Sequence, residues 1–142
     1  MSNPEPLNVE VARASSKPLE ELLDRALRAA HLQRGGALLT ETIMAGRSIN
    51  EVLVEAVSLG SLFVARDAEH PVGFALVGHG VLMSVYVDAA YRRRGVAREL
   101  VGAVIASQRA VLDAFALPGD RATKSLYESF GWKARLLTMR AE

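Results

Sequence analysis

The stretch that decides the fold runs Val81-Leu-Met-Ser-Val-Tyr-Val-Asp-Ala-Ala-Tyr-Arg-Arg-Arg-Gly-Val-Ala-Arg-Glu-Leu-Val101. Its first seven residues are mostly apolar and β-branched, which predicts a strand whose two faces are both largely buried. A polar bend and three consecutive arginines follow, and a helical period starts around Gly95. Apolar residues then recur at three-and-four spacing along one stripe of the expected helix, at Val96, Ala97, Leu100, Val101, Val104 and Ile105.

The order strand, basic glycine turn, helix is suited to binding a phosphate. The first N–H groups of a helix have no partner within it, and the helix dipole favours an anion there. Gly95 has no Cβ, so the backbone can approach a phosphate closely, and the small Ala97 lets the helix lie near the strand. The alternative is a solvated basic turn that the glycine only caps, because short glycine motifs often match by chance.

Two motifs resemble those of the GNAT family of N-acetyltransferases. Arg92-x-x-Gly95-x-Ala97 is similar to the family's (Gln/Arg)-x-x-Gly-x-(Gly/Ala) loop. Residues 120–132, Asp-Arg-Ala-Thr-Lys-Ser-Leu-Tyr-Glu-Ser-Phe-Gly-Trp, resemble its Asn-x(6)-Tyr-(Glu)-x-x-Gly-(Phe/Trp) segment. The motifs occur in the family's order, and the resemblance extends from about Leu62 to the end of the chain. It implies an α+β, GNAT-like acyl-CoA N-acyltransferase fold, with a mixed, mostly antiparallel sheet and helices on both faces.

The resemblance also implies where acetyl-CoA is held as a co-substrate. In the family the loop holds the pyrophosphate, which assigns that role to Arg92, Arg93, Arg94, Gly95, Val96, Ala97 and Arg98. Main-chain groups of the preceding strand grip the acetyl and pantetheine arms, here Val85, Tyr86 and Val87. A backbone N–H of Val85 or Val87 is the expected oxyanion donor, because the family's strand pair splays after this point. The alternative is that Val85, Tyr86 and Val87 are ordinary strand residues with no part in binding.

The second motif supplies a catalytic candidate, Tyr127, at the position where the family often has a tyrosine that protonates the departing thiolate. A phenol pKa of about 10 and a thiol pKa near 8.5 lie within about two units of each other. The alternative is a half-buried ring that packs beside Leu126 and Phe130. Asp120 stands where the family usually has asparagine. It can cap the helix start, but it cannot donate a hydrogen bond to the cofactor as asparagine would. We therefore expect Asp120 to act mainly as a helix cap and only secondarily as a cofactor ligand.

The sequence leaves the identity of the general base open. Val81 to Val87 contain no Glu or Asp, although relatives often place a carboxylate there. Asp113 resembles in position an acid found in some members, and Glu41 and His79 are other candidates. A chain of water molecules is the remaining alternative.

Composition narrows the remaining possibilities. A chain of 142 residues, half of them hydrophobic, is expected to fold as one domain, residues 1–142. Its 17 basic and 16 acidic side chains nearly cancel, which disfavours general nucleic-acid or membrane-surface binding. There is no cysteine and the three histidines lack metal-like spacing, so no metal is expected. Because no apolar span or signal peptide is evident, a cytoplasmic location is expected.

Pattern along the chain predicts a strand, two helices, three antiparallel strands, a helix, a strand, a helix and a final strand. The strands are expected at 7–14, 62–65, 72–77, 81–87, 111–116 and 132–139, the fifth of them buried. Ser16 and Pro18 open the first helix and Gly35-Gly36 stops it. A less regular piece, 37–45, is expected to be a short helix, and Ser48-x-x-Glu51 is a capping box for the next one. In relatives the early helices wall the acceptor site.

The function expected is N-acetyl transfer from acetyl-CoA to a primary amine of a small molecule or peptide, by direct attack on the thioester. The alternative is a non-catalytic acyl-CoA sensor or interaction module of the same fold. A nucleic-acid module using Arg92-Arg93-Arg94 is disfavoured by the near-zero net charge and the lack of interleaved aromatics. A homodimer is expected, because an apolar strand at the end of a sheet invites pairing.

Overall fold

The structure, a computed structural model, describes residues 7–107 and 113–141. Along the chain its elements are β1 (Asn8–Val11), α1 (Lys17–His31), α2 (Gly36–Met44), α3 (Ile49–Ser58), β2 (Leu62–Asp67), β3 (His70–Gly78), β4 (Val81–Val87), the 3₁₀ turn η1 (Ala89–Tyr91), α4 (Val96–Ser107), β5 (Asp113–Ala114) and α5 (Arg121–Ser129). The strands form one sheet in the order β1-β2-β3-β4-β5. Neighbours are antiparallel except β4 and β5, which are parallel. The expected mixed, mostly antiparallel α+β sheet is confirmed.

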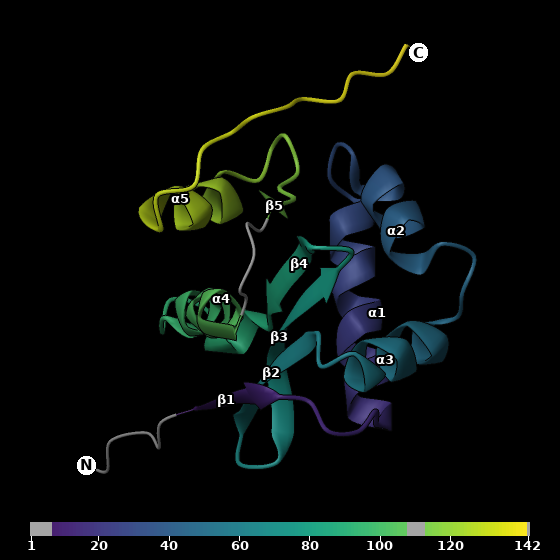
Figure 1. The fold of residues 1–142 in the computed structure, drawn as a ribbon, viewed down its shortest axis with the longest axis vertical. Helices are drawn as coiled ribbons and strands as arrows, with labels where there is room; N and C mark the ends of the chain where they lie inside the picture. The colour runs from purple at the N-terminus through teal and green to yellow at the C-terminus, as the bar shows by residue number, and fades with distance from the viewer. Residues whose placement is uncertain (1–6, 108–112, 142) are drawn as a thin grey trace.

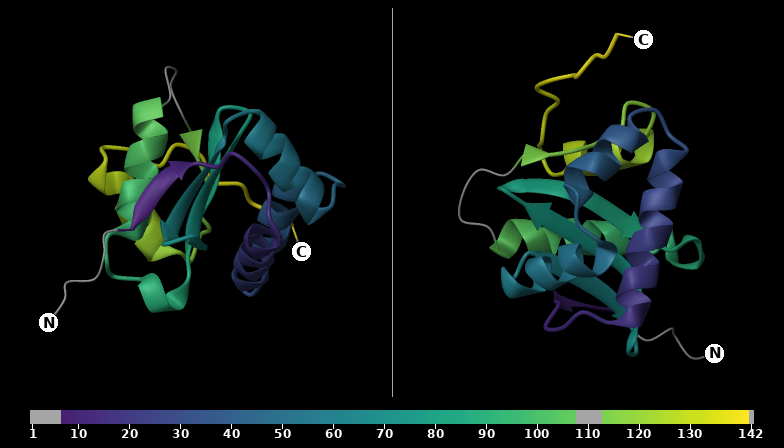
Figure 2. Two further views of the ribbon diagram at one scale, coloured as in Figure 1. Left: turned by 90° about the horizontal axis from the view of Figure 1, so that it is seen from below. Right: turned by 90° about the vertical axis from the view of Figure 1, so that its right-hand side faces the viewer.

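Helices cover both faces of the sheet (Figures 1 and 2). Helices α1, α2 and α3 lie on one face, and α4 and α5 lie on the other. Each face has its own apolar core, because side chains alternate between the faces of a strand. On β2, Leu62 and Val64 pack toward α1–α3, whereas Phe63 and Ala65 pack toward α4. Burial on both faces accounts for the continuous apolar runs of the central strands.

Helix starts follow the signals in the sequence. Ser16 caps α1, and its hydroxyl accepts a hydrogen bond from the Leu19 N–H at 3.3 Å. The predicted capping box at α3 is present, with Ser48 and Glu51 exchanging side-chain and backbone hydrogen bonds. The expected short helix at 37–45 is α2. None of the described helices is long and apolar enough to cross a lipid bilayer.

The boundary between α1 and α2 differs from the prediction. Helix α1 ends at His31, before the glycine pair, and Gly36 is the first residue of α2. The reason is close approach: a Cβ on Gly36 would lie 1.7 Å from the Ala30 carbonyl oxygen. Only glycine lets the start of α2 press onto the end of α1, which brings Leu39 of α2 beside the last turns of α1.

A two-residue turn joins β3 and β4, as the Gly78-His79-Gly80 sequence predicts. His79 and Gly80 have φ angles of 52° and 76°, the left-handed conformation that type I′ hairpin turns need. The register then shifts: Val77 faces Leu82 and Leu76 faces Ser84, so Met83 is a bulge residue without a partner on β3.

The prediction for the fifth strand is confirmed only in part, and the prediction for the sixth is wrong. Of the strand expected at 111–116, residues 111 and 112 lie outside the described part of the chain, and only Asp113 and Ala114 pair, neither of them buried. The strand expected at 132–139 does not form: residues 133–141 leave α5 as an irregular tail that runs away from the sheet (Figure 1). Apolar content alone does not make a strand, because its backbone groups need a partner strand.

Gly36→Ala tests the packing of α2 on α1. The added methyl group overpacks the contact with Ala30, which should lower the free energy of unfolding by about 1–3 kcal/mol. Gly102→Ala is the matched control: it lies inside α4, and its Cβ would meet no atom within 4 Å. There alanine should be neutral or stabilise by about 0.5–1 kcal/mol. Urea unfolding of both variants checks the pair, and equal stability would show that the α1–α2 contact is not tight.

Candidate functional site

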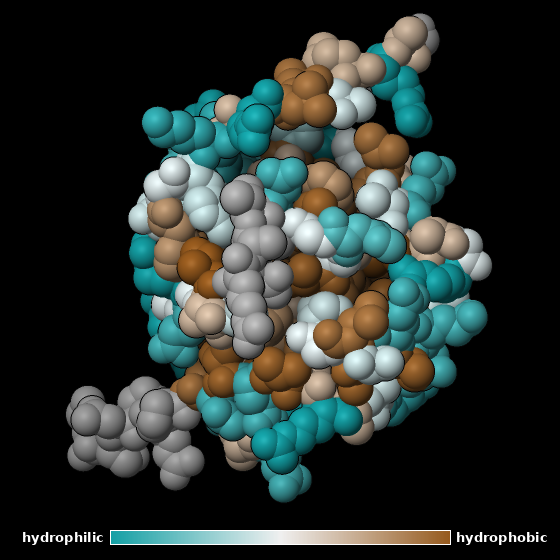
Figure 3. Space-filling model, in the orientation of Figure 1, coloured by the Kyte–Doolittle hydropathy of each residue, from teal (hydrophilic) through white to brown (hydrophobic). Residues whose placement is uncertain are grey.

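Strands β4 and β5 diverge almost as soon as they pair. Val81 and Leu82 face Asp113 and Ala114, and one further hydrogen bond joins the Phe115 N–H to the Leu82 carbonyl oxygen at 2.9 Å. Beyond Leu82, no strand among the described residues covers this edge of β4. A cleft of about 620 Å³ lies along the free edge, a size within the range of ligand pockets. In Figure 3 apolar side chains are visible on the face between the two helical layers, with polar ones around the margin.

The free edge presents main-chain groups to the cleft. The N–H of Asp88 donates to the Val72 carbonyl oxygen at 2.8 Å, and Tyr86 faces Phe74, so Tyr86 is turned toward β3. Because successive residues of a strand point their polar groups to opposite sides, the N–H and C=O of Val85 and Val87 point away from β3. One of these groups is used: Arg92 Nε donates to the Val87 carbonyl oxygen at 3.0 Å.

The turn after β4 delivers the start of α4 to the same cleft. Arg93 and Gly95 both adopt left-handed backbone, with φ angles of 65° and 78°. Strain at a non-glycine residue such as Arg93 is concentrated at functional sites in proteins. The Gly95 carbonyl accepts from the Glu99 N–H at 3.0 Å, so the helical bonds begin there. Within the described residues no group accepts from the N–H groups of Val96, Ala97 and Arg98, and a Cβ on Gly95 would enter open space.

The arginines of the turn divide into two sets. Arg92, Arg93 and Arg98 line the cleft, whereas Arg94 does not. Arg92 lies over the Tyr86 ring at 5.8 Å and Arg98 over the Phe130 ring at 5.6 Å, contacts that hold both guanidinium groups in place. Arg94 instead lies over the Tyr91 ring at 5.2 Å and is not itself a lining residue.

Tyr127 lies in the wall of the cleft on α5. Its side chain is 6% exposed, and its ring packs on Trp132 with the centroids 5.3 Å apart. The hydroxyl is buried and has no hydrogen-bond partner among the described residues, which is costly for a polar atom. Burial raises the pKa of the Tyr127 hydroxyl well above its ordinary value, and the Asp120 carboxylate adds to the shift. The gap to a thiol pKa is therefore wider than ordinary values suggest, and the group stays protonated at neutral pH.

Asp120 acts as a helix cap. Its Oδ1 accepts from the Thr123 N–H at 3.0 Å and its Oδ2 from the Thr123 hydroxyl at 2.6 Å. Both oxygens are thus engaged at the start of α5, although Asp120 also lines the cleft.

Helices α1 and α2 form the opposite wall. Asp88, directly after β4, accepts two hydrogen bonds from Arg25 of α1, at 3.1 and 2.9 Å. At the other end the loop between α1 and α2 reaches the loop before α5, since a Cβ on Gly35 would lie 3.4 Å from Pro118. The pair α1 and α2 is therefore fixed at one end to the residue after β4 and at the other end to the loop before α5.

The structure brings nearly all the predicted cofactor residues to one cleft: Val85, Tyr86, Val87, Arg92, Arg93, Gly95, Val96, Ala97, Arg98 and Asp120, together with Tyr127. It does not bring Arg94 there. The three candidate bases, Asp113, Glu41 and His79, are exposed and do not line the cleft. The resemblance implied that the early helices wall the acceptor site, but sequence reasoning did not single out the lining residues, which are Ala26, Ala29 and Ala30 of α1 and Gln33 just after it. Their spacing of three and four is equally typical of core packing, so it did not mark them.

Comparison with known proteins places this geometry in context. Residues 58–134, more than half of the chain, match the family described as "Acetyltransferase (GNAT) domain". No curated protein matches the chain significantly.

Solved structures with the same fold include a GNAT family acetyltransferase from Streptococcus pneumoniae, 19% identical, with a TM-score of 0.60 over 96% of this chain and 100% of that one. PaiA N-acetyltransferase from Thermoplasma acidophilum, in complex with coenzyme A, is 16% identical, with a TM-score of 0.62 over 90% and 91%. An aminoglycoside acetyltransferase from an uncultured soil sample, in complex with sisomicin, is 17% identical, with a TM-score of 0.61 over 96% and 95%. At these identities the likeness shows a shared fold.

The buried hydroxyl of Tyr127 predicts a particular alkaline pH dependence. Its pKa is raised in the folded chain, so above pH of about 10 the unfolded chain releases this proton first, and the free energy of unfolding falls as pH rises. The loss approaches about 1.4 kcal/mol per pH unit for this one group. Tyr127→Phe should lack this component, whereas other ionisations affect both proteins alike. Thermal unfolding of both between pH 7 and 11 checks this, and a difference in stability that stays constant across the range would contradict the buried, unpartnered hydroxyl.

Proposed function

This chain belongs to the GNAT family of acetyltransferases, and on that basis we propose that it transfers an acetyl group from acetyl-CoA to a primary amine of a small molecule or peptide. The amine attacks the thioester directly. The observation that carries the proposal is the free edge of β4, which shares one cleft with the start of α4 and the unpartnered Tyr127 hydroxyl.

The residues present fit acetyl-CoA. The unused N–H groups of Val96, Ala97 and Arg98, the open space at Gly95 and the nearby Arg93 suit a pyrophosphate. The outward N–H and C=O of Val85 suit an amide-containing arm that adds to the strand edge as another strand would. A thioester next to the Tyr127 hydroxyl would give that orphaned donor an acceptor. When bound, acetyl-CoA supplies an activated acyl group and a thiolate leaving group.

The chain's own groups have distinct roles in this proposal. The N–H of Val85 or Val87 donates to the carbonyl oxygen as negative charge develops there. Fixed main-chain donors of this kind contribute strongly because they need no reorganisation. The Tyr127 hydroxyl holds a proton that it can donate to the departing sulfur. Arg92, held by the Val87 carbonyl and the Tyr86 ring, keeps the end of β4 in place.

Proton removal from the amine is assigned to water. Among the described residues that line the cleft, Asp120 is the one carboxylate, and both its oxygens are already bonded to Thr123. The exposed Asp113, Glu41 and His79 lie away from the cleft wall. An amine that loses its proton to solvent before it enters needs no side-chain base for that step. After attack the nitrogen loses a second proton to water, and Tyr127, having given its proton to the sulfur, is reprotonated from water.

Gly95→Asp tests the cofactor assignment. Acetyl-CoA should raise the Tm of the parent protein, and the variant should lose this shift because it places a Cβ and a negative charge beside the pyrophosphate site. Gly60→Asp is the matched control, since Gly60 also has a positive φ, of 66°, with open space around it and no contact with the cleft. Both variants carry similar backbone strain, so the two should differ only in whether acetyl-CoA still raises their Tm. A folded Gly95→Asp protein that binds as tightly as the parent would refute the assignment.

Tyr127→Phe tests catalysis against simple binding. The ring and its packing on Trp132 are kept while the proton donor is removed, so kcat should fall by about 10²–10⁴ with cofactor affinity nearly unchanged. Tyr91→Phe is the control, because that hydroxyl already donates to Asp67 at 2.7 Å. Coenzyme A release with an accepted amine, under conditions where chemistry limits the rate, measures both. An unchanged kcat in Tyr127→Phe would leave this tyrosine with packing alone, and no release with any amine would favour the non-catalytic acyl-CoA module.

A homodimer remains part of the proposal. The tail after α5 exposes three large apolar side chains, with 90% of Leu136, 63% of Leu137 and 80% of Met139 accessible, and apolar side chains are visible along it at the top of Figure 3. A second copy that covers them would remove this surface from water. Sedimentation at micromolar concentration should give the mass of two chains, and a mass of one chain would rule the dimer out.

A further inference from the structure

The two ends of the cleft lie on opposite faces of the sheet and differ in chemistry. The start of α4, with Val96 and Ala97, lies on the face covered by α4 and α5. The other end is lined from α1, α2 and the opposite face of β4. We name it the acceptor end, defined by Ala29, Ala30, Gln33, Leu39, Met83 and Phe115. Met83 belongs to the α1–α3 core, and Phe115, the residue after Ala114, points to the same face by strand alternation.

The acceptor end is apolar apart from Gln33. Arg92, Arg93 and Arg98 line the same cleft outside this end. The one carboxylate among the described lining residues is Asp120, whose two oxygens accept from Thr123 at 3.0 and 2.6 Å. A second ammonium group at the acceptor end would therefore have no free carboxylate among the described lining residues to pair with, in a site where low polarity makes an unpaired charge costly.

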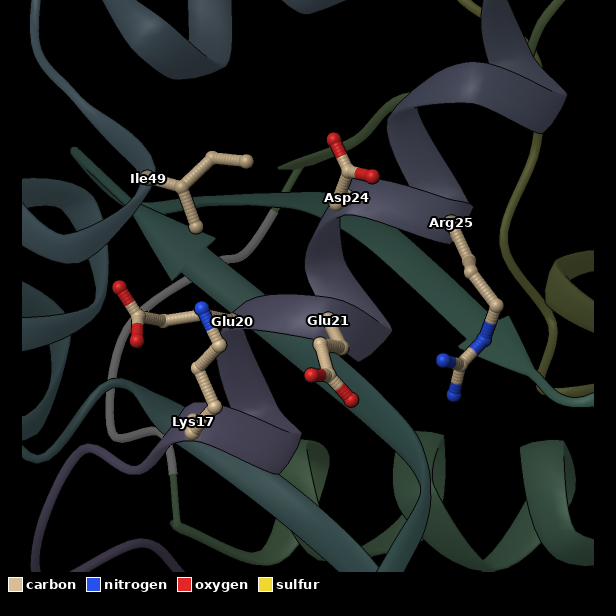
Figure 4. Close-up of a pocket in the computed structure, with 6 residues that line it drawn as sticks. All are labelled: Lys17, Glu20, Glu21, Asp24, Arg25 and Ile49. Carbon is tan, nitrogen blue, oxygen red and sulfur yellow. The ribbon is translucent and has the colours of Figure 1, made fainter.

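The acidic residues of α1 do not provide the missing carboxylate. Glu20, Glu21 and Asp24 line a separate surface hollow, together with Lys17, Arg25 and Ile49. In Figure 4 these side chains project from α1 in front of the sheet, with Lys17 close to Glu20. None of these three acids is among the residues that line the cleft, so none of them supplies a carboxylate to the acceptor end.

We propose that the acceptor is a primary amine with an apolar body and no second positive charge. This inference rests on the proposed acetyl transfer. A monoamine loses its only charge when it is deprotonated, and its apolar body can then replace water against Ala29, Ala30, Leu39 and Met83. A diamine or polyamine keeps a further ammonium group, which would have to be desolvated at the acceptor end without a partner. The acceptor end thus selects against polycations by the cost of desolvating an unpaired charge and for monoamines by apolar contact.

Hexylamine and 1,6-diaminohexane are matched probes, because they share one chain length and differ in the second amine. With the full chain saturated in acetyl-CoA, kcat/KM from coenzyme A release should be at least about tenfold higher for hexylamine, with both compared as the neutral reacting amine. A diamine that reacts equally well or better overturns the proposal.

Gln33→Glu adds a carboxylate to the acceptor end while keeping side-chain size, at an exposed position where the fold should tolerate it. It should raise kcat/KM for the diamine. The ratio of kcat/KM for hexylamine to that for the diamine should therefore fall several-fold. Leu38→Glu is the control: it adds the same charge nearby on α2, at a side chain that is 37% exposed and does not line the cleft. If both variants change the ratio equally, general electrostatics accounts for the effect and the assignment of the acceptor end fails.

Calorimetry separates this inference from the proposed reaction. If acetyl-CoA binds but neither amine releases coenzyme A, catalysis fails while selectivity can still be measured, by titrating each amine into the protein–coenzyme A complex. Tighter binding of hexylamine supports the proposal. Equal binding, tighter binding of the diamine, or no binding of hexylamine at millimolar concentration contradicts it.

Discussion

The divergence of β4 and β5 is the constraint on which the rest of this molecule depends. A sheet normally satisfies the N–H and C=O groups of a central strand on both sides, because unpaired buried groups are costly. Here the pairing stops after Leu82, and Val85 and Val87 keep their polar groups turned toward a cleft. The cost is tolerable because the cleft is open to water, and it leaves a strand edge that a ligand can complete.

Several features hold this divergence open. The bulge at Met83 sets which residues of β4 face outward, so that Val85 and Val87, and not Tyr86, present their main chain to the cleft. Arg25 and Asp88 join α1 to the end of β4, and Gly36 lets α2 press against α1. Across the cleft, Asp120 starts α5 and thereby places Tyr127. These contacts come from separate parts of the chain and converge on one short segment.

The sequence predicted the central part of this arrangement well because its signals are local. A β-branched run, a glycine turn and a helical period lie next to each other in 81–101, and the Ser48 capping box depends on residues only three apart. The last expected strand did not form, and the fifth formed only in part, for the opposite reason. Residues 132–139 are apolar enough for a strand, but strand formation depends on a partner elsewhere in the chain, and β5 is only two residues long.

Properties that arise from three-dimensional proximity were likewise beyond sequence reasoning. Ala26 and Ala30 lie one helical turn apart, a spacing equally typical of a core stripe and of a cleft wall, and nothing local distinguishes the two. The raised pKa of Tyr127 results from burial by segments that are distant in sequence. The requirement for glycine at position 36 results from the Ala30 carbonyl, which only the tertiary packing brings near.

Amide hydrogen exchange tests the central claim most directly, because it reads the free edge of β4 one residue at a time. In the free protein the N–H groups of Val85 and Val87 should exchange quickly for a central strand, while that of Tyr86, paired across to Phe74, should be protected. Saturating coenzyme A should slow exchange at Val85 or Val87 and leave Tyr86 unchanged. Protection of Val85 and Val87 in the free protein, or no change at either on addition of coenzyme A, would contradict a strand edge that is kept open for the cofactor.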